Sequence, residues 1–191
     1  MASYAVAQDR VMSGVLGKVL LITISFVCIV LSGFVRIPVP FTPVPVTVQT
    51  LFVILCAGMV GGSGAVWPAA LYIAAGCAGL PVFSTSIPGC AYMMGPTGGY
   101  MAGFLAASVI MGWAVPRSGG SFLRIALAGT CAAAAILACG MAWLVLGCRL
   151  PLHAAFFAGG VPFIIPDMVK VSIAAAFLAR IKPQMQRSRG V

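Results

Sequence analysis

Six long apolar stretches alternate with short connections along this chain of 191 residues. They cover residues 15–35, 46–60, 65–80, 96–115, 125–146 and 154–181. Their lengths approach or exceed the roughly 20 residues that a helix needs to cross the hydrocarbon of a bilayer, and strand-like alternation is lacking. The pattern predicts an all-α integral membrane protein with six transmembrane helices, in which residues 1–191 form a single domain.

Glycine and proline interrupt this pattern in two places. The second and third stretches are short and are divided only by Gly-Gly-Ser-Gly at residues 61–64. One long broken helix is an alternative, but a hairpin fits their combined length better. In the last stretch we expect Pro162 and Pro166 to bend the helix, or to delay its regular start until after Pro166.

The composition agrees with a membrane protein. Hydrophobic residues make up 62% of the chain and charged residues 7%, with a mean hydropathy of +1.14. A soluble domain of this length could not cover such a composition with a polar surface, so we expect it to lie in a lipid bilayer. The formal net charge of +9 comes from scattered basic residues, which argues against nucleic acid as a partner.

The basic residues also predict an orientation. If both termini are cytoplasmic, Arg36 and Arg149 lie outside, Lys170 lies in the membrane, and the other eight lie inside. These eight are Arg10, Lys18, Arg117, Arg124, Arg180, Lys182, Arg187 and Arg189. Because the cytoplasmic segments of membrane proteins carry an excess of Lys and Arg, this distribution favours cytoplasmic termini.

A charge pair in the last apolar stretch is the first candidate site. Asp167 is one of only two acidic residues, and Lys170 follows it three residues later. Each costs about 2.5–3.5 kcal/mol at the centre of a membrane helix, so we expect the pair to serve a function. In a helix that begins near Pro166, both side chains lie on one face of the first turn, beside free backbone N–H groups. These groups suit a small polar ligand with N–H groups and an anionic end. The alternative is that Asp167 only caps the helix and neutralises Lys170.

Two connections on the predicted outer side are candidates to cover a site. Residues 37–46 read IPVPFTPVPV, and their four prolines favour an extended backbone with few free N–H donors. Residues 81–96 read PVFSTSIPGCAYMMGP, without charge, and carry the hydroxyls of Ser84, Thr85, Ser86 and Tyr92. Such a segment is more typical of a lid than of a solvated loop.

Further polar residues lie in the apolar stretches. GPTGGY at residues 95–100 lacks the Lys-Ser/Thr end of a phosphate loop, so we expect its glycines to allow close helix packing. Thr97 and Tyr100 then offer hydroxyls to the site. Gln49 and Tyr72 are further candidates, for which the alternative is a hydrogen bond between helices.

The sequence predicts neither enzymatic activity nor a cofactor. It has no nucleotide motif, no Cys-x-x-Cys pair among its seven cysteines, and a single histidine, His153. Metal binding, catalysis by a serine–histidine pair and ATP hydrolysis therefore lack the residues they need. Ser13 and Gly17 have the small-xxx-small spacing of helix contacts near the predicted cytoplasmic end, where a partner helix could dock; internal packing is the alternative.

The chain resembles the BioY family, the biotin-binding substrate components of energy-coupling factor (ECF) transporters. The resemblance is carried by PVPFTPVPVTVQTL at 38–51, GLPVFS at 79–84, GPTGGYMAGF at 95–104 and PFIIPDMVK at 162–170. It implies a six-helix S-component of the bacterial plasma membrane that captures biotin from outside. It also implies a transmembrane coupling subunit and paired ATPases as partners.

The resemblance further implies roles for the site residues. The ureido N–H groups of biotin would bind Asp167 and its valerate carboxylate Lys170, with apolar walls from Phe41, Phe83 and Tyr100. The family often has an Asn or a basic residue in the connection at 81–96, for which the hydroxyls of Ser84, Thr85 and Ser86 stand in here.

Two other functions remain as alternatives. In a small proton-coupled exporter, Asp167 would titrate during transport, although Lys170 nearby favours its ionised form. In a membrane scaffold subunit without a ligand, the charge pair would affect stability alone.

Overall fold

The computed structural model describes residues 14–37, 42–83 and 89–187, with side chains as far as Ile181. This part of the chain is mostly helical. The helices are α2 (Val15–Phe34), α3 (Gln49–Val60), the short 3-10 helix η1 (Gly62–Val66), α4 (Trp67–Cys77), α5 (Cys90–Met94), α6 (Gly98–Arg117), α7 (Phe122–Leu146), α8 (Leu152–Gly159) and α9 (Val161–Arg187). Two short antiparallel strands, β1 (Arg36–Ile37) and β2 (Val46–Thr47), connect α2 to α3.

Four helical segments of the described chain are long and apolar enough to cross a membrane. They are α2, α6, α7 and the combined segment Leu152–Ile181. Helices α3 and α4, with 12 and 11 residues, are shorter than a full span. Large apolar side chains are exposed on all four long segments, among them Leu16, Val109, Leu127 and Ile165. Soluble proteins rarely expose so many, so this surface is that of a membrane protein.

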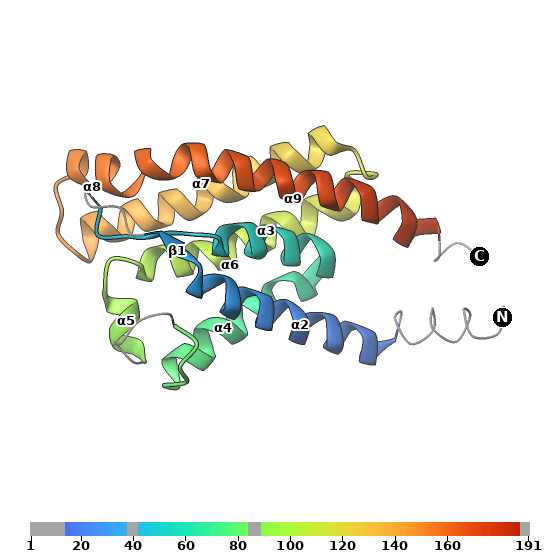
Figure 1. Cartoon of the computed structure of the whole chain (residues 1–191), viewed down its shortest axis with the longest axis horizontal. Helices are drawn as coiled ribbons and strands as arrows, with labels where there is room; N and C mark the ends of the chain where they lie inside the picture. Colours follow the sequence, from blue (N-terminus) through green and yellow to red (C-terminus); the bar gives the residue numbers. More distant parts are fainter. Residues whose placement is uncertain (1–13, 38–41, 84–88, 188–191) are drawn as a thin grey trace.

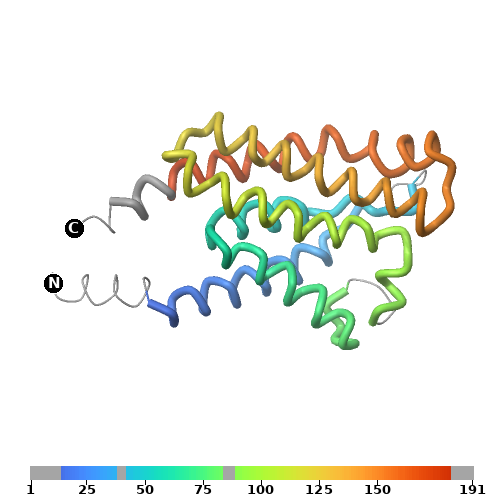
Figure 2. Tube along the Cα trace, turned by 180° about the vertical axis from the view of Figure 1, so that it is seen from behind, coloured from blue at the N-terminus to red at the C-terminus, as the bar shows by residue number. Residues whose placement is uncertain are grey.

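Helices α3 and α4 form a hairpin, as the sequence predicts. Gly61 and Gly62 have φ angles of 66° and 57°, a conformation that glycine adopts without steric cost, and η1 completes the reversal. Figure 1 shows α3 running toward the end of the molecule where α2 begins and α4 running back, and Figure 2 shows the same from behind. The alternative of one broken helix is therefore wrong.

The prediction that the last helix begins after Pro166 is also wrong. The break lies instead at Gly160, between α8 and α9, and α9 begins at Val161. Pro162 falls in its first turn, where a residue without an N–H group costs nothing. Pro166 lies inside the helix and removes a single backbone hydrogen bond. Asp167 is consequently in the second turn of α9, past the free N–H groups, and cannot cap the helix.

Gly99 of the GPTGGY segment and Gly103, four residues later, bring α6 and α7 together. A Cβ atom at Gly99 would collide with Cys139 and Trp143, and one at Gly103 would lie 2.6 Å from the Cα atom of Ile136. Only glycine fits at these two positions, which confirms the packing role predicted for this segment.

The two ends of the molecule differ in their elements and charge. The strands β1 and β2, α5 and α8 lie at one end, named here the hairpin end; α2 begins and α9 ends at the other (Figure 1). Exposed Arg36 and Arg149 are at the hairpin end. The opposite end carries the exposed residues Lys18, Arg117, Arg124 and Arg180.

Candidate functional site

The charge pair of α9 forms an ion pair inside the protein. The ammonium Nζ of Lys170 is 2.8 Å from Oδ1 of Asp167. Asp167 is 2% exposed and Lys170 9%. One helical turn separates the two, which brings their side chains onto the same face. Each charge needs the other, because a single unpaired charge at such a buried position is strongly destabilising.

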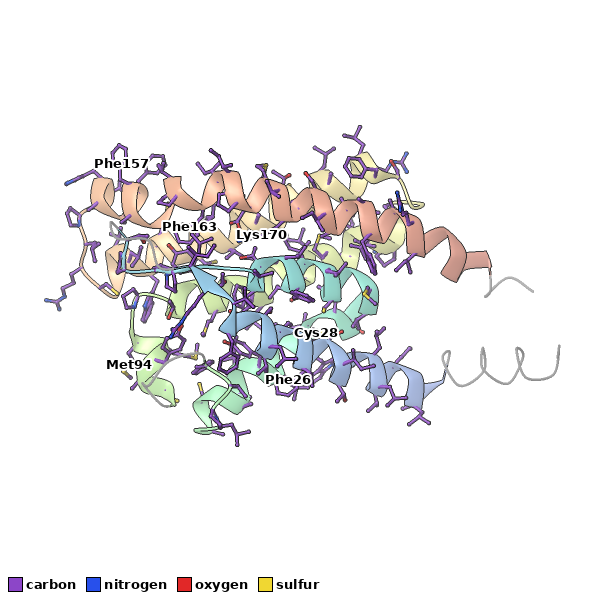
Figure 3. All side chains as sticks on the ribbon, in the orientation of Figure 1. Phe26, Cys28, Met94, Phe157, Phe163 and Lys170 are labelled. Atoms are coloured by element: carbon purple, nitrogen blue, oxygen red, sulfur yellow. The ribbon has the colours of Figure 1, made fainter. Side chains whose placement is uncertain are left out.

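A cavity lies beside this pair. Its walls come from β2, α3, α4, α5, α6, α7 and α9, together with the residues just before β2 and α6. The lining residues are Val44, Pro45, Thr47, Gln49, Thr50, Tyr72, Tyr92, Thr97, Tyr100, Met101, Phe104, Ile136, Leu137, Phe163, Asp167 and Lys170. Figure 3 shows Phe163 and Lys170 on the side of α9 that faces α3 and the strands. The cavity volume is about 50 Å³, so the lining side chains must move to admit a larger ligand.

The cavity brings together six of the residues that the sequence predicts for the site. They are Asp167, Lys170, Gln49, Tyr72, Thr97 and Tyr100. Phe83 is buried but does not line the cavity. Its ring packs edge-on against Tyr72, with centroids 5.3 Å apart, and against Tyr92 at 4.8 Å. Phe83 thus packs against two tyrosines that line the cavity and helps to hold their rings in place.

The remaining predicted residues lie apart from this cavity or outside the described residues. Phe41, Ser84, Thr85, Ser86 and Ser13 are outside the described residues. Gly17 is buried in α2, although its neighbours Leu16 and Lys18 are exposed.

Gln49 joins two helices as well as lining the cavity. Its Nε2 donates a hydrogen bond to the carbonyl oxygen of Ile29 in α2, at 3.1 Å. A Cβ atom at Gly33 would lie 3.1 Å from this same nitrogen, so the glycine makes room for the amide. Because Nε2 is held in this way, the side-chain oxygen is left to accept a hydrogen bond from a ligand.

Tyr100 is fixed by its hydroxyl. The hydroxyl group donates to the carbonyl oxygen of Gly159, at 2.8 Å, which connects α6 to the end of α8. Its ring packs at 5.9 Å from that of Phe163, and both rings line the cavity. The tyrosine therefore offers a ligand mainly its apolar face.

Thr97 carries a polar atom without a partner. Its Oγ1 is buried and forms no hydrogen bond within the described part of the chain. Buried polar groups are nearly always hydrogen-bonded, and those that are not are often found at functional sites. Thr97 is also one of the residues that line the cavity, so its hydroxyl is a candidate partner for a ligand there.

Tyr92, whose hydroxyl the sequence analysis names in the connection at 81–96, also lines the cavity. Sequence reasoning did not single out nine other lining residues: Val44, Pro45, Thr47, Thr50, Met101, Phe104, Ile136, Leu137 and Phe163. Thr47 and Thr50 could have been found, since both are polar and stand within two residues of Gln49. Ile136 and Leu137 could not, because nothing separates them from the other apolar residues of α7.

The arrangement suits binding rather than catalysis. An ion pair offers a hydrogen-bond acceptor beside a donor, and aromatic and aliphatic side chains surround it. Within the described residues, no three His, Cys, Asp or Glu side chains are grouped as metal ligands. Few polar groups in a mostly apolar cavity are typical of a site for a small molecule.

Comparison with known proteins agrees with this description. The sequence pattern of the BioY family matches residues 6–187. The biotin transporter BioY of Thermotoga maritima is 33% identical over 147 residues, which cover 76% of this chain and 85% of that protein. The protein of the same name from Rhodobacter capsulatus is 32% identical over 192 residues, or 91% of this chain and 98% of that one.

A solved structure shares the fold. It is the crystal structure of the S-component for biotin from an ECF-type ABC transporter, with a TM-score of 0.79 and 22% sequence identity. The match covers 87% of this chain and 91% of that chain. The arrangement of helices described above is therefore that of an ECF S-component.

Proposed function

The chain belongs to the BioY family, and on this premise we propose that it takes part in biotin uptake by binding biotin in the cavity beside Asp167 and Lys170. It is a transport protein rather than an enzyme. The observation that carries the location of the site is the ion pair itself: two charges that are costly in a membrane border a cavity with aromatic walls.

The geometry of the pair favours the ureido ring of biotin as its ligand. Asp167 and Lys170 are 2.8 Å apart, so their charges compensate and they present an acceptor next to a donor. The edge of a ureido ring has the complementary groups, an N–H beside a C=O. A ligand carboxylate at Lys170 would lie close to the carboxylate of Asp167, and the two negative charges would repel each other. We therefore propose that the valerate carboxylate of biotin does not bind Lys170.

The apolar part of biotin matches the chemistry of the rest of the cavity. Tyr72, Tyr100 and Phe163 supply aromatic walls, and the oxygen of Gln49 and the hydroxyl of Thr97 supply further polar contacts. Phe41, Ser84 and Thr85 belong to the connections at 37–46 and 81–96, whose residues Val44, Pro45 and Tyr92 line the cavity, and we propose that they complete the site.

The proposed topology has six membrane segments in one domain of residues 1–191, with α3 and α4 as the two short ones. Both termini are cytoplasmic, and the hairpin end faces outward. The described basic residues support this orientation, since four lie at the end where α2 begins and α9 ends and two at the hairpin end. The membrane is the bacterial plasma membrane.

The proposed partners are a transmembrane coupling subunit and paired ATPases. The S-component fold supports this, because the solved structure of that fold comes from an ECF-type ABC transporter. The chain has no nucleotide motif of its own, so energy from ATP requires other subunits. We propose Ser13 and Gly17 on the cytoplasmic side as part of the contact with the coupling subunit.

A titration tests the proposal. Biotin is titrated calorimetrically into the detergent-purified protein and into Asp167→Asn, with His153→Ala as a control because this exposed residue lies outside the cavity. We expect saturable binding at one biotin per chain, weakened in Asp167→Asn and unchanged in His153→Ala. If the folded wild-type protein does not bind biotin, the proposal fails, and the exporter and scaffold alternatives lead.

A further inference from the structure

The cavity offers no uncompensated positive charge to an anionic ligand. Among the described residues that line it, Lys170 is the only cation, and Asp167 already neutralises Lys170 at 2.8 Å. Biotin carries a carboxylate in addition to its ureido ring. If the ring binds the ion pair, as proposed above, the carboxylate needs a cation elsewhere, because an unpaired charge near apolar walls is costly.

The strands supply such a cation. Thr47 and Pro45 line the cavity, whereas Val46 between them does not, as expected when alternate residues of a strand face opposite sides. Arg36 is directly opposite Thr47 in the antiparallel pair. Residues directly opposite each other project from the same face, with Cβ atoms roughly 4.5–5.5 Å apart. Arg36 therefore stands on the cavity face of the hairpin, beside a lining residue.

Neighbouring contacts support this register. The backbone N–H of Val48 donates to the carbonyl oxygen of Val35, at 3.2 Å, so the same pairing continues one residue beyond Arg36 and Thr47. Hydrogen-bonded and non-hydrogen-bonded pairs alternate in an antiparallel ladder, which makes Arg36 and Thr47 a pair of the second kind. The side chains of such pairs are the closest of the ladder.

The guanidinium of Arg36 is available to a ligand. The side chain is exposed and forms no ion pair with the described side chains. The whole sequence holds two acidic residues, and the buried one, Asp167, is engaged with Lys170. A guanidinium can bind both oxygens of a carboxylate through parallel N–H donors, and its long side chain can reach across a cavity mouth.

We propose that Arg36 binds the carboxylate of the ligand at the hairpin end of the cavity, while Asp167 and Lys170 hold its ureido ring inside. This inference rests on biotin binding and adds the residue that selects an acid over its neutral analogues. Arg36 also raises the local concentration of the anion, because an exposed cation at a binding site steers oppositely charged ligands toward it. Arg149, another exposed cation of this end, lies between α7 and α8 and outside the strand pair, and it serves as the control.

Six titrations test the role of Arg36. Biotin and its uncharged carboxamide are each titrated into the wild type, into Arg36→Gln, which keeps a hydrogen-bonding side chain but removes the charge, and into Arg149→Gln. We expect Arg36→Gln to weaken biotin roughly tenfold, as for the loss of a charge-assisted hydrogen bond, and to leave the carboxamide unchanged. Arg149→Gln should change neither.

Salt provides a second readout. Added salt screens exposed charges, so biotin binding to the wild-type protein should weaken as salt rises, and the slope should be smaller for Arg36→Gln. If biotin and its carboxamide bind Arg36→Gln as well as they bind the wild type, the role of Arg36 is overturned, while biotin binding itself stands. If the wild type binds neither ligand, the proposed function fails instead.

Discussion

The hydroxyl of Tyr100 donates a hydrogen bond to the carbonyl oxygen of Gly159, at 2.8 Å, and so joins α6 to the end of α8. This contact lies next to the break at Gly160, from which α9 begins. Because α9 carries Asp167 and Lys170, this bond between residues 59 positions apart in sequence helps to set where the charge pair lies relative to the cavity.

Tyr100→Phe removes this hydrogen bond and keeps the ring. The buried carbonyl of Gly159 then loses its partner, and we expect the protein to become less stable by about 1–2 kcal/mol. The melting temperature in detergent measures the effect. Tyr92→Phe is the matched control, since no hydrogen bond of its hydroxyl is found within the described residues. Equal melting temperatures for both variants would show that the Tyr100 bond contributes nothing.

Thr97→Val replaces a hydroxyl by a methyl group of nearly the same size. The Oγ1 atom is buried without a partner in the described chain, so its removal should leave stability unchanged or raise it slightly. If the hydroxyl meets the ligand, the variant should bind biotin several-fold more weakly. Thr130→Val is a control, since Thr130 is exposed and bonds only to the carbonyl oxygen of Ala126. A variant that loses stability but not affinity would assign Thr97 to the fold instead.

The ion pair can be separated into its effects on stability and on binding. Lys170→Met leaves Asp167 buried without its partner, and we expect a loss of about 3–5 kcal/mol. The double variant Asp167→Asn with Lys170→Met has no charge to compensate and should regain much of that stability. Biotin binding should remain weak in both, because the complementary donor and acceptor are gone. If the double variant binds biotin as well as the wild type does, Asp167 and Lys170 are not part of the binding site.

The same pair distinguishes two orientations of biotin. If the ureido ring binds it, Lys170→Met should weaken biotin and its carboxamide by the same factor. A larger loss for the acid alone would instead put the carboxylate on Lys170, as the family resemblance first suggested. Both ligands are titrated at the same salt concentration, so that the charge of the ligand is the only difference between the two titrations.

Partner binding is tested on the proposed cytoplasmic side. Replacing Ser13 and Gly17 together by leucine should block close approach of another helix and reduce co-purification of the coupling subunit. Because Gly17 is buried, a leucine at this position can also disturb the fold. Biotin binding by the variant therefore serves as the control for folding. Loss of biotin binding together with association would favour internal packing over a partner contact.

Much of this structure can be predicted from the sequence, because long apolar stretches and isolated charged residues are strong physical signals. The charge pair is predicted from two costly residues three positions apart, and the hairpin of α3 and α4 from the glycines between them. The spacing of GPTGGY likewise predicts close packing of α6.

Other features depend on packing that no local pattern reveals. Because proline is typical of a helix start, the sequence predicts the start of α9 too late; in the structure Pro166 lies inside α9 and the break is at Gly160. Phe83 is predicted to line the site, but its ring packs against Tyr72 and Tyr92 without lining the cavity. The alignment of Arg36 with Thr47 depends on strand register, which the proline-rich segment does not specify.

The central claim is that biotin lies in this cavity with its ureido ring on the charge pair. The most direct measurement is an experimental structure of the protein with biotin bound. We expect the ureido N–H and C=O groups within hydrogen-bonding distance of Asp167 and Lys170, and the carboxylate toward Arg36 at the hairpin end. Biotin bound outside the cavity, or with its carboxylate on Lys170, would contradict the account.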